Sequence, residues 1–351
     1  MISVEDLRAA VQGGVVSEAQ AARLISLAQA RGLAKSGLSP SEEPFVLFKG
    51  FNEIFIIVGL SILFGGWTAM IWLWVGGPYE DSPLASAVMS VVTLAGLASL
   101  QGYFTSKRRM VGPSMLLALM TGCAITWLGI ILAEALHLGA GRDWALTSGL
   151  VALGMVLHYR AFRVPFDAAI IAVSGFAALW SLISGEGVIP LEAWALLSIF
   201  GSGSAGIVSI LFGLVCFGVA MWFDMRDPHR VSTRAATGFW LHVLAAPAIL
   251  NPLAVTLMDQ GQVGQFGLIA LLNLLALVAL IIDRRSFLVS GALYAVWLVF
   301  ALLDGSVFTI FALGLGLVVL GAQWERLRAA LLRALPDFAG KTRLPPYGMS
   351  Q

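Results

Sequence analysis

Charged side chains are scarce in this 351-residue chain, and long stretches contain none. Asp, Glu, Lys and Arg make up 12% of the residues, about half the share of an average soluble domain, and 59% are hydrophobic. The mean hydropathy is +0.89. This composition excludes an ordinary soluble domain. The net charge of +1 also argues against nucleic-acid binding, which needs a surplus of basic residues.

Cysteine is nearly absent, and the familiar catalytic and metal-binding motifs are missing. Cys123 and Cys216 lie inside apolar stretches, where packing is their expected role, so a disulfide framework is excluded. No HExxH, P-loop, GxSxG or EF-hand pattern occurs. Glu134 and His137 have the spacing of a carboxylate-bridged metal centre, but such a centre needs a second Glu-x-x-His. We therefore expect no catalytic residue, no metal site and no cofactor.

Apolar runs of about twenty residues, the length of a transmembrane helix, recur from residue 51 onward. They predict an all-α fold, a polytopic transmembrane helix bundle of about ten spans. The predicted spans are 53–75, 84–104, 112–133, 144–160, 166–184, 204–223, 236–257, 264–282, 286–303 and 306–323. Residues 188–223 are too long for one span, and the Gly- and Ser-rich run at 201–206 breaks them. Whether 188–203 is interfacial, re-entrant or spanning stays open.

The basic residues predict the orientation of the bundle. Every Lys and Arg except Arg142 falls in residues 1–50, in alternate loops or after residue 323. Because positively charged loops stay in the cytoplasm during insertion, both termini are expected there. Arg outnumbers Lys 17 to 4, and Ala and Gly are abundant, which is typical of a GC-rich bacterial genome. We therefore predict a multi-pass protein of the bacterial cytoplasmic (inner) membrane.

Two cytoplasmic parts flank the ten-span domain at 51–323. Residues 1–50 are predicted to form a helical hairpin and a linker, with a capping box at Ser17 and Gln20 and no cleavable signal peptide. Residues 324–351 are predicted to form a basic amphipathic helix on the cytoplasmic leaflet, followed by an extended tail. Its apolar residues follow helical spacing while its arginines, Arg326, Arg328 and Arg333, point elsewhere.

The seventh predicted span carries the most unusual pattern, with His242, Pro247, Asn251 and Pro252. Each proline removes a backbone donor and leaves the carbonyl four residues earlier, at Val243 and Ala248, without its usual partner. One interpretation is a broken helix that lines a substrate cavity, since lipid cannot satisfy such groups. The other is a kinked packing helix in which His242 is bonded near the cytoplasmic interface.

Other polar residues near the spans are further candidates for substrate binding. Asn273 lies near the middle of a span, and we expect it to pair with Asn251 or with a freed carbonyl of the seventh span. Asn52 and Glu53 open the first span, where the carboxyl can carry a proton or pair with a cation. The alternative for Glu53, and for Asp167, is an acid that favours a helix N-terminus or forms a salt bridge.

The first 30 residues resemble one family. Leu7 to Gly14, then Val16-Ser-Glu-Ala-Gln20 and Leu24, give a helix, a glycine turn and a second helix start ahead of serial spans. This layout resembles the uncharacterised bacterial DUF2157-type membrane proteins. The resemblance implies a many-helix inner-membrane protein and no particular activity or site.

Two functions remain open. The first is a transporter or binder of a small or lipid-like substrate, with the first, sixth, seventh and eighth spans nearest its path. The second is a non-transporting scaffold or accessory subunit, which is consistent with the few ionisable residues in the bundle. It would recruit a membrane or cytoplasmic protein through residues 1–50 and 324–351. In both cases the lipid bilayer is a partner and nucleic acid is not.

Overall fold

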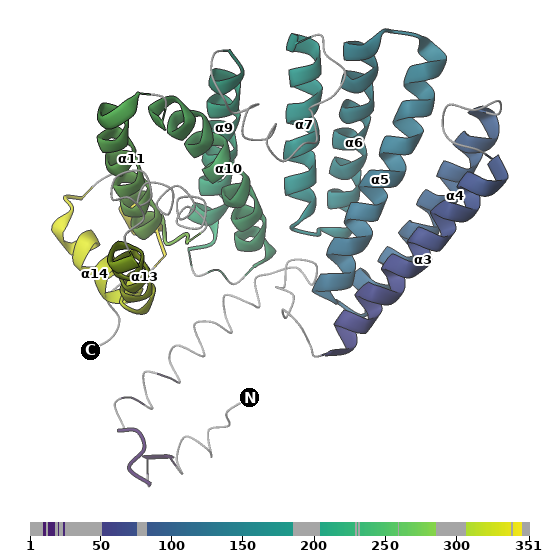
Figure 1. Cartoon of the computed structure of the whole chain (residues 1–351). Helices are drawn as coiled ribbons and strands as arrows, with labels where there is room; N and C mark the ends of the chain where they lie inside the picture. The colour runs from purple at the N-terminus through teal and green to yellow at the C-terminus, as the bar shows by residue number, and fades with distance from the viewer. Residues whose placement is uncertain are drawn as a thin grey trace.

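The structure is a computed structural model. It describes residues 51–75, 83–184, 204–228, 230, 232–258, 260–285, 307–337 and 340–345, and before them only 10–11, 13–17, 20 and 24. All regular elements within these ranges are helices (Figure 1). They are α3 (Phe51–Val75), α4 (Pro83–Gln101) with the π-helical turn η1 (Gly102–Lys107), α5 (Val111–Leu136), α6 (Ala140–Phe162), α7 (Asp167–Ser184), α9 (Ser204–Arg226), α10 (Thr233–Met258), α11 (Gly261–Ile282), α13 (Val307–Ala322), α14 (Trp324–Ala334) and the short 3-10 helix η2 (Lys341–Arg343).

Seven of the described helices are long and apolar enough to cross a membrane: α3, α4 with η1, α5, α6, α9, α10 and α11. The fifth and tenth predicted spans correspond to α7 and α13, which have 18 and 16 residues. At 1.5 Å per residue these helices reach about 27 and 24 Å, less than a hydrocarbon core of about 30 Å. The predicted span at 286–303 and the segment 188–203 lie outside the described residues.

The helices form two groups (Figure 1). In the figure α3 to α7 stand side by side, in blue to teal, and α9 to α14 form a second group in green to yellow. Contacts between α7 and α10 join the groups. The first group packs around Leu117 and Met155, and the second around Leu250, Leu268 and Trp324.

Small residues let α9 and α10 approach closely, as is common between membrane helices. A Cβ added to Gly213 would lie 2.6 Å from Ile249 Cγ1, and one added to Gly238 would lie 2.6 Å from Asp224 Oδ1. The second contact matters for function, because Asp224 belongs to the polar cluster described below.

The seventh predicted span is one continuous helix, α10, with both prolines inside it. Ser209 of α9 is fully buried, and its hydroxyl donates to the carbonyl of Ala248 at 2.9 Å. Pro252 has no N–H group, so the carbonyl of Ala248, four residues earlier, lacks its usual donor within the helix. The neighbouring helix therefore satisfies this carbonyl, and of the two interpretations the structure supports the packing helix.

The two flanking parts are described only in places. Ser17 and Gln20 exchange the two bonds of a capping box, at 2.9 and 3.2 Å, as predicted. The rest of the predicted hairpin lies outside the described residues. In α14, Arg328 was expected to point away from the apolar side, which is wrong: its side chain is 2% exposed. It donates to the carbonyls of Leu280 and Pro345, at 3.1 and 2.7 Å.

Candidate functional site

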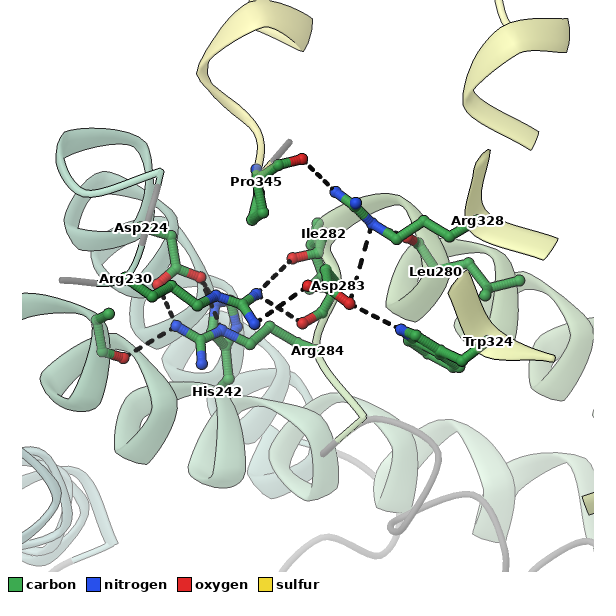
Figure 2. Close-up of polar contacts among 11 residues, drawn as sticks. Asp224, Arg230, His242, Leu280, Ile282, Asp283, Arg284, Trp324, Arg328 and Pro345 are labelled. Carbon is green, nitrogen blue, oxygen red and sulfur yellow. Dashed lines mark hydrogen bonds and ion pairs between the residues drawn. The ribbon is translucent and has the colours of Figure 1, made fainter. Parts of the chain in front are cut away.

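A buried polar cluster joins three helix ends at the end of the bundle where α9 meets α10 (Figure 2). The carboxylate of Asp224, in the last turn of α9, accepts hydrogen bonds from His242 and from Arg284. His242 Nε2 of α10 lies 3.0 Å from its Oδ2, and Arg284, just after α11, donates through Nε at 2.9 Å and through Nη2. Arg284 Nη2 also donates to the carbonyl of Ala235 at 2.9 Å. Asp224, His242 and Arg284 are 4%, 0% and 7% exposed, so the cluster is largely shielded from solvent.

The end of α11 turns Arg284 toward Asp224. Asp283 adopts a left-handed conformation with φ of +57°, and the N–H groups of Asp283 and Arg284 both bond the carbonyl of Ala279. Glycine usually occupies such a helix-ending position, but a short polar residue tolerates it. The turn is held from outside, because Trp324 Nε1 donates to Asp283 Oδ1 at 2.7 Å.

Arg230, from the α9–α10 loop, completes this arrangement. Its Nη1 lies 3.1 Å from Asp283 Oδ2, and its Nη2 donates to the Asp283 carbonyl at 2.7 Å. Burial, and then the nearby charge of Arg284, lower the pKa of Arg230, while Asp283 and Asp224 oppose the shift. A guanidinium stays charged in proteins all the same, so the loop presents a partly desolvated cation.

A cavity of about 420 Å³, here called the α10 cavity, lies beside this cluster. Its volume is within the usual range for small-molecule sites. Arg230, Arg284, Ser232, Thr233 and Ser114 supply the polar lining. The rest is apolar and comes from α5, the α6–α7 turn and α10: Val111, Met115, Val164, Pro165, Phe166, Ala235, Ala236, Phe239 and Trp240. Phe166 and Trp240 meet edge to face, with ring centroids 4.8 Å apart.

A second acid–histidine pair lies on the α6–α7 side. His158 Nδ1 is 2.7 Å from Oδ2 of Asp167, the first residue of α7, and the side chain of Asp167 is fully buried. Asp167 therefore lies at a helix N-terminus with a histidine as its partner, and not a loop arginine. Nearby, the Tyr159 hydroxyl lies 3.3 Å from Thr237 Oγ1 and connects α6 to α10.

The structure separates the residues that the sequence proposed as a binding site. His242 belongs to the Asp224 cluster, whereas Asn251 lies nine residues further along α10, about 13.5 Å at the helical rise. The pairing expected for Asn273 is wrong, because its amide donates to the carbonyl of Ile269 in its own helix at 2.8 Å and its side chain is exposed.

The two prolines also differ in surroundings. Pro247 is half-buried, whereas Pro252 borders a separate cavity of about 250 Å³ between α9, α10 and α11. Of the residues that line this second cavity, Thr256 alone has a polar side chain, and it donates to the Pro252 carbonyl at 2.7 Å. The cavity therefore offers an apolar ligand little to orient it.

At the start of α3, Asn52 is exposed and Glu53 is fully buried. Glu53 lies against the start of α5, since a Cβ added to Gly112 would come within 3.7 Å of its Oε2. Among the described residues no three His, Cys, Asp or Glu side chains gather as a metal site.

Sequence reasoning missed Asp224, Arg284 and Thr233, because each sits at a predicted span boundary and was counted as a loop charge or not at all. The available signal was that Asp224 directly follows a long apolar stretch, at an end of the bundle rich in basic residues. No family model, curated protein or solved structure matches the chain. The resemblance to DUF2157-type proteins therefore stays a prediction.

Proposed function

We propose that the chain is an integral membrane protein that binds a small lipid-like molecule in the α10 cavity. The amphipathic lining of this cavity is the observation that carries the proposal. One side offers Arg284 and Thr233, and the other offers Phe166 and Trp240. An amphipathic molecule needs both kinds of surface, and ligand sites commonly combine an apolar wall with a few placed polar groups.

The position of the cavity favours a ligand that comes from the membrane. It lies at the ends of helices long and apolar enough to span a bilayer, where lipid headgroups meet water. The one-sided distribution of basic residues supports an orientation with this end in the cytoplasm. A bacterial inner-membrane location and a transport role are part of the same proposal.

The scaffold alternative has weaker support. It needs an amphipathic tail that is free to recruit a partner, but Trp324 and Leu332 of α14 are buried, and so is Leu344 after it. The described part of the tail thus packs against its own chain.

Photolabelling with a diazirine-bearing fatty acid tests the proposal on the purified full-length chain. We expect label on the peptides that carry Phe166 and Trp240. Ala236→Trp, which fills the cavity, should reduce labelling there at least about tenfold, equivalent to about 1.4 kcal/mol. Ala98→Trp, at an exposed site on α4, is the matched control. Label that is spread evenly over the lipid-facing helices and unaffected by Ala236→Trp would overturn the proposal.

A further inference from the structure

We propose that the α10 cavity recognises a phosphate group on its lipid-like ligand, held by the N-terminus of α10, Thr233 and Arg284. This inference rests on the proposed function, because it names the headgroup of the molecule bound in the same cavity. It places the phosphate at the polar side of the lining and the acyl chain against Phe166 and Trp240.

The start of α10 is a favourable place for an anion. The helix has 26 residues, and its first backbone N–H groups have no partner inside the helix. The helix dipole adds partial positive charge at this end. Ser232 caps only one donor, since its hydroxyl accepts from the Arg234 N–H at 3.2 Å.

Thr233 supplies an independent sign of a ligand. It lines the cavity and is 6% exposed. Among the described residues no hydrogen bond engages its hydroxyl, and only its carbonyl has a side-chain partner, the hydroxyl of Thr237. A phosphate oxygen in the cavity would accept this hydroxyl proton.

Arg284 points to the same ligand from the opposite side. Its Nε and Nη2 are occupied by Asp224 and the Ala235 carbonyl, whereas Nη1 has no partner in the part of the chain that the structure describes. Because Arg284 also lines the cavity, Nη1 is the donor that remains for a ligand. Asp224, itself held by His242, acts as a positioning residue that fixes the guanidinium before the ligand arrives.

The donors that remain favour a phosphate headgroup over a group with fewer oxygens. Asp224 and Asp283 are engaged by Arg284 and Arg230, and the Asp227 carboxylate accepts hydrogen bonds from the N–H and the hydroxyl of Ser232 beside the start of α10. Donors from a hydroxyl, a guanidinium and a helix end suit a group with several oxygens, which a phosphate has.

Lipid competition tests this inference on the full-length chain in phosphatidylcholine nanodiscs. The bound probe is the diazirine fatty acid, and the competitors are phosphatidic acid, phosphatidylglycerol, a fatty acid and inorganic phosphate. We expect phosphatidic acid to compete at least about tenfold better than the fatty acid, since charge-assisted bonds are the strong ones. Inorganic phosphate should compete weakly, because it lacks the chain that fills the apolar side.

Two variants locate the preference. Thr233→Val keeps the side-chain volume and leaves Asp224 untouched, so it should reduce the phosphatidic acid preference about fivefold. Arg284→Lys keeps the positive charge beside Asp224 but loses the planar guanidinium with its several N–H donors. It should therefore reduce the phosphatidic acid preference more than Thr233→Val does. Thr256→Val, at the far end of the same helix, removes only a bond within the helix and should leave the preference unchanged.

The outcomes separate the inference from the proposed function. Equal competition by phosphatidic acid and the fatty acid, with labelling still confined to the cavity, would overturn the phosphate assignment and leave the proposed function standing. Inorganic phosphate that competes as well as phosphatidic acid would identify a soluble anion as the ligand. Absence of labelling in the cavity would overturn both. A preference that Thr233→Val does not change would remove Thr233 and the α10 start from the site.

Discussion

Asp224→Asn is the substitution that most directly tests how the buried cluster holds the bundle together. The carboxylate accepts from His242 Nε2 and from two nitrogens of Arg284. Asparagine keeps the shape but has one acceptor oxygen, so its amide nitrogen would face a donor of Arg284. It also leaves a guanidinium that is only 7% exposed without its counter-charge.

The expected loss is large. Removing one partner of a buried ion pair costs about 3–5 kcal/mol. At about 2 °C per kcal/mol for a chain of this length, the Tm should fall by about 6–10 °C. Thermal unfolding in detergent, followed by the fluorescence of the 11 tryptophans, measures this shift.

Two comparisons make the result decisive. Asp337→Asn is the control, because Asp337 is 98% exposed and its contact to Lys341 at 3.0 Å is a surface ion pair, so the Tm should not change. Arg284→Gln added to Asp224→Asn should recover most of the loss, since no buried charge is then left alone. A Tm for Asp224→Asn equal to that of Asp337→Asn, or a double variant whose loss is the sum of the single losses, would refute the reasoning.

The contacts between α9 and α10 give two further predictions for the same unfolding assay. Ser209→Ala should destabilise the protein by about 1–3 kcal/mol, because the Ala248 carbonyl loses the only donor that the structure provides from α9; an unchanged Tm would show that the carbonyl needs no partner. Gly213→Ala should cost about 1–3 kcal/mol through overlap with Ile249, whereas Gly218→Ala, with no described atom within 4 Å, should be neutral or stabilising. Equal effects at the two glycines would contradict the close packing.

The helices could be predicted from the sequence because a span depends on local hydropathy. The first predicted span, 53–75, corresponds to α3 at Phe51–Val75, and the eighth, 264–282, lies within α11 at Gly261–Ile282. The fifth predicted span, 166–184, likewise corresponds to α7 at Asp167–Ser184, which begins directly after the turn at Pro165.

The candidate site was only partly predictable. One of the two interpretations gives His242 a hydrogen-bond partner, and the structure shows such a bond, but nothing local identified the partner as Asp224. Asn251 and Asn273 drew attention because they lie deep in apolar segments, yet Asn273 satisfies its amide within its own helix. A polar side chain within a span needs a hydrogen-bond partner. Which residue serves as that partner depends on which helices pack beside the span.

The sequence by itself determined that this is a chain of long apolar helices with its basic residues gathered in alternate loops, because hydropathy and charge act over a few residues at a time. Only the tertiary structure decided that Asp224 meets Arg284, sixty residues away, and that Thr233 and Arg284 border one cavity with Phe166 and Trp240. Those contacts depend on the packing of α9, α10 and α11 and on the turn at Asp283. No local pattern specifies such long-range neighbours.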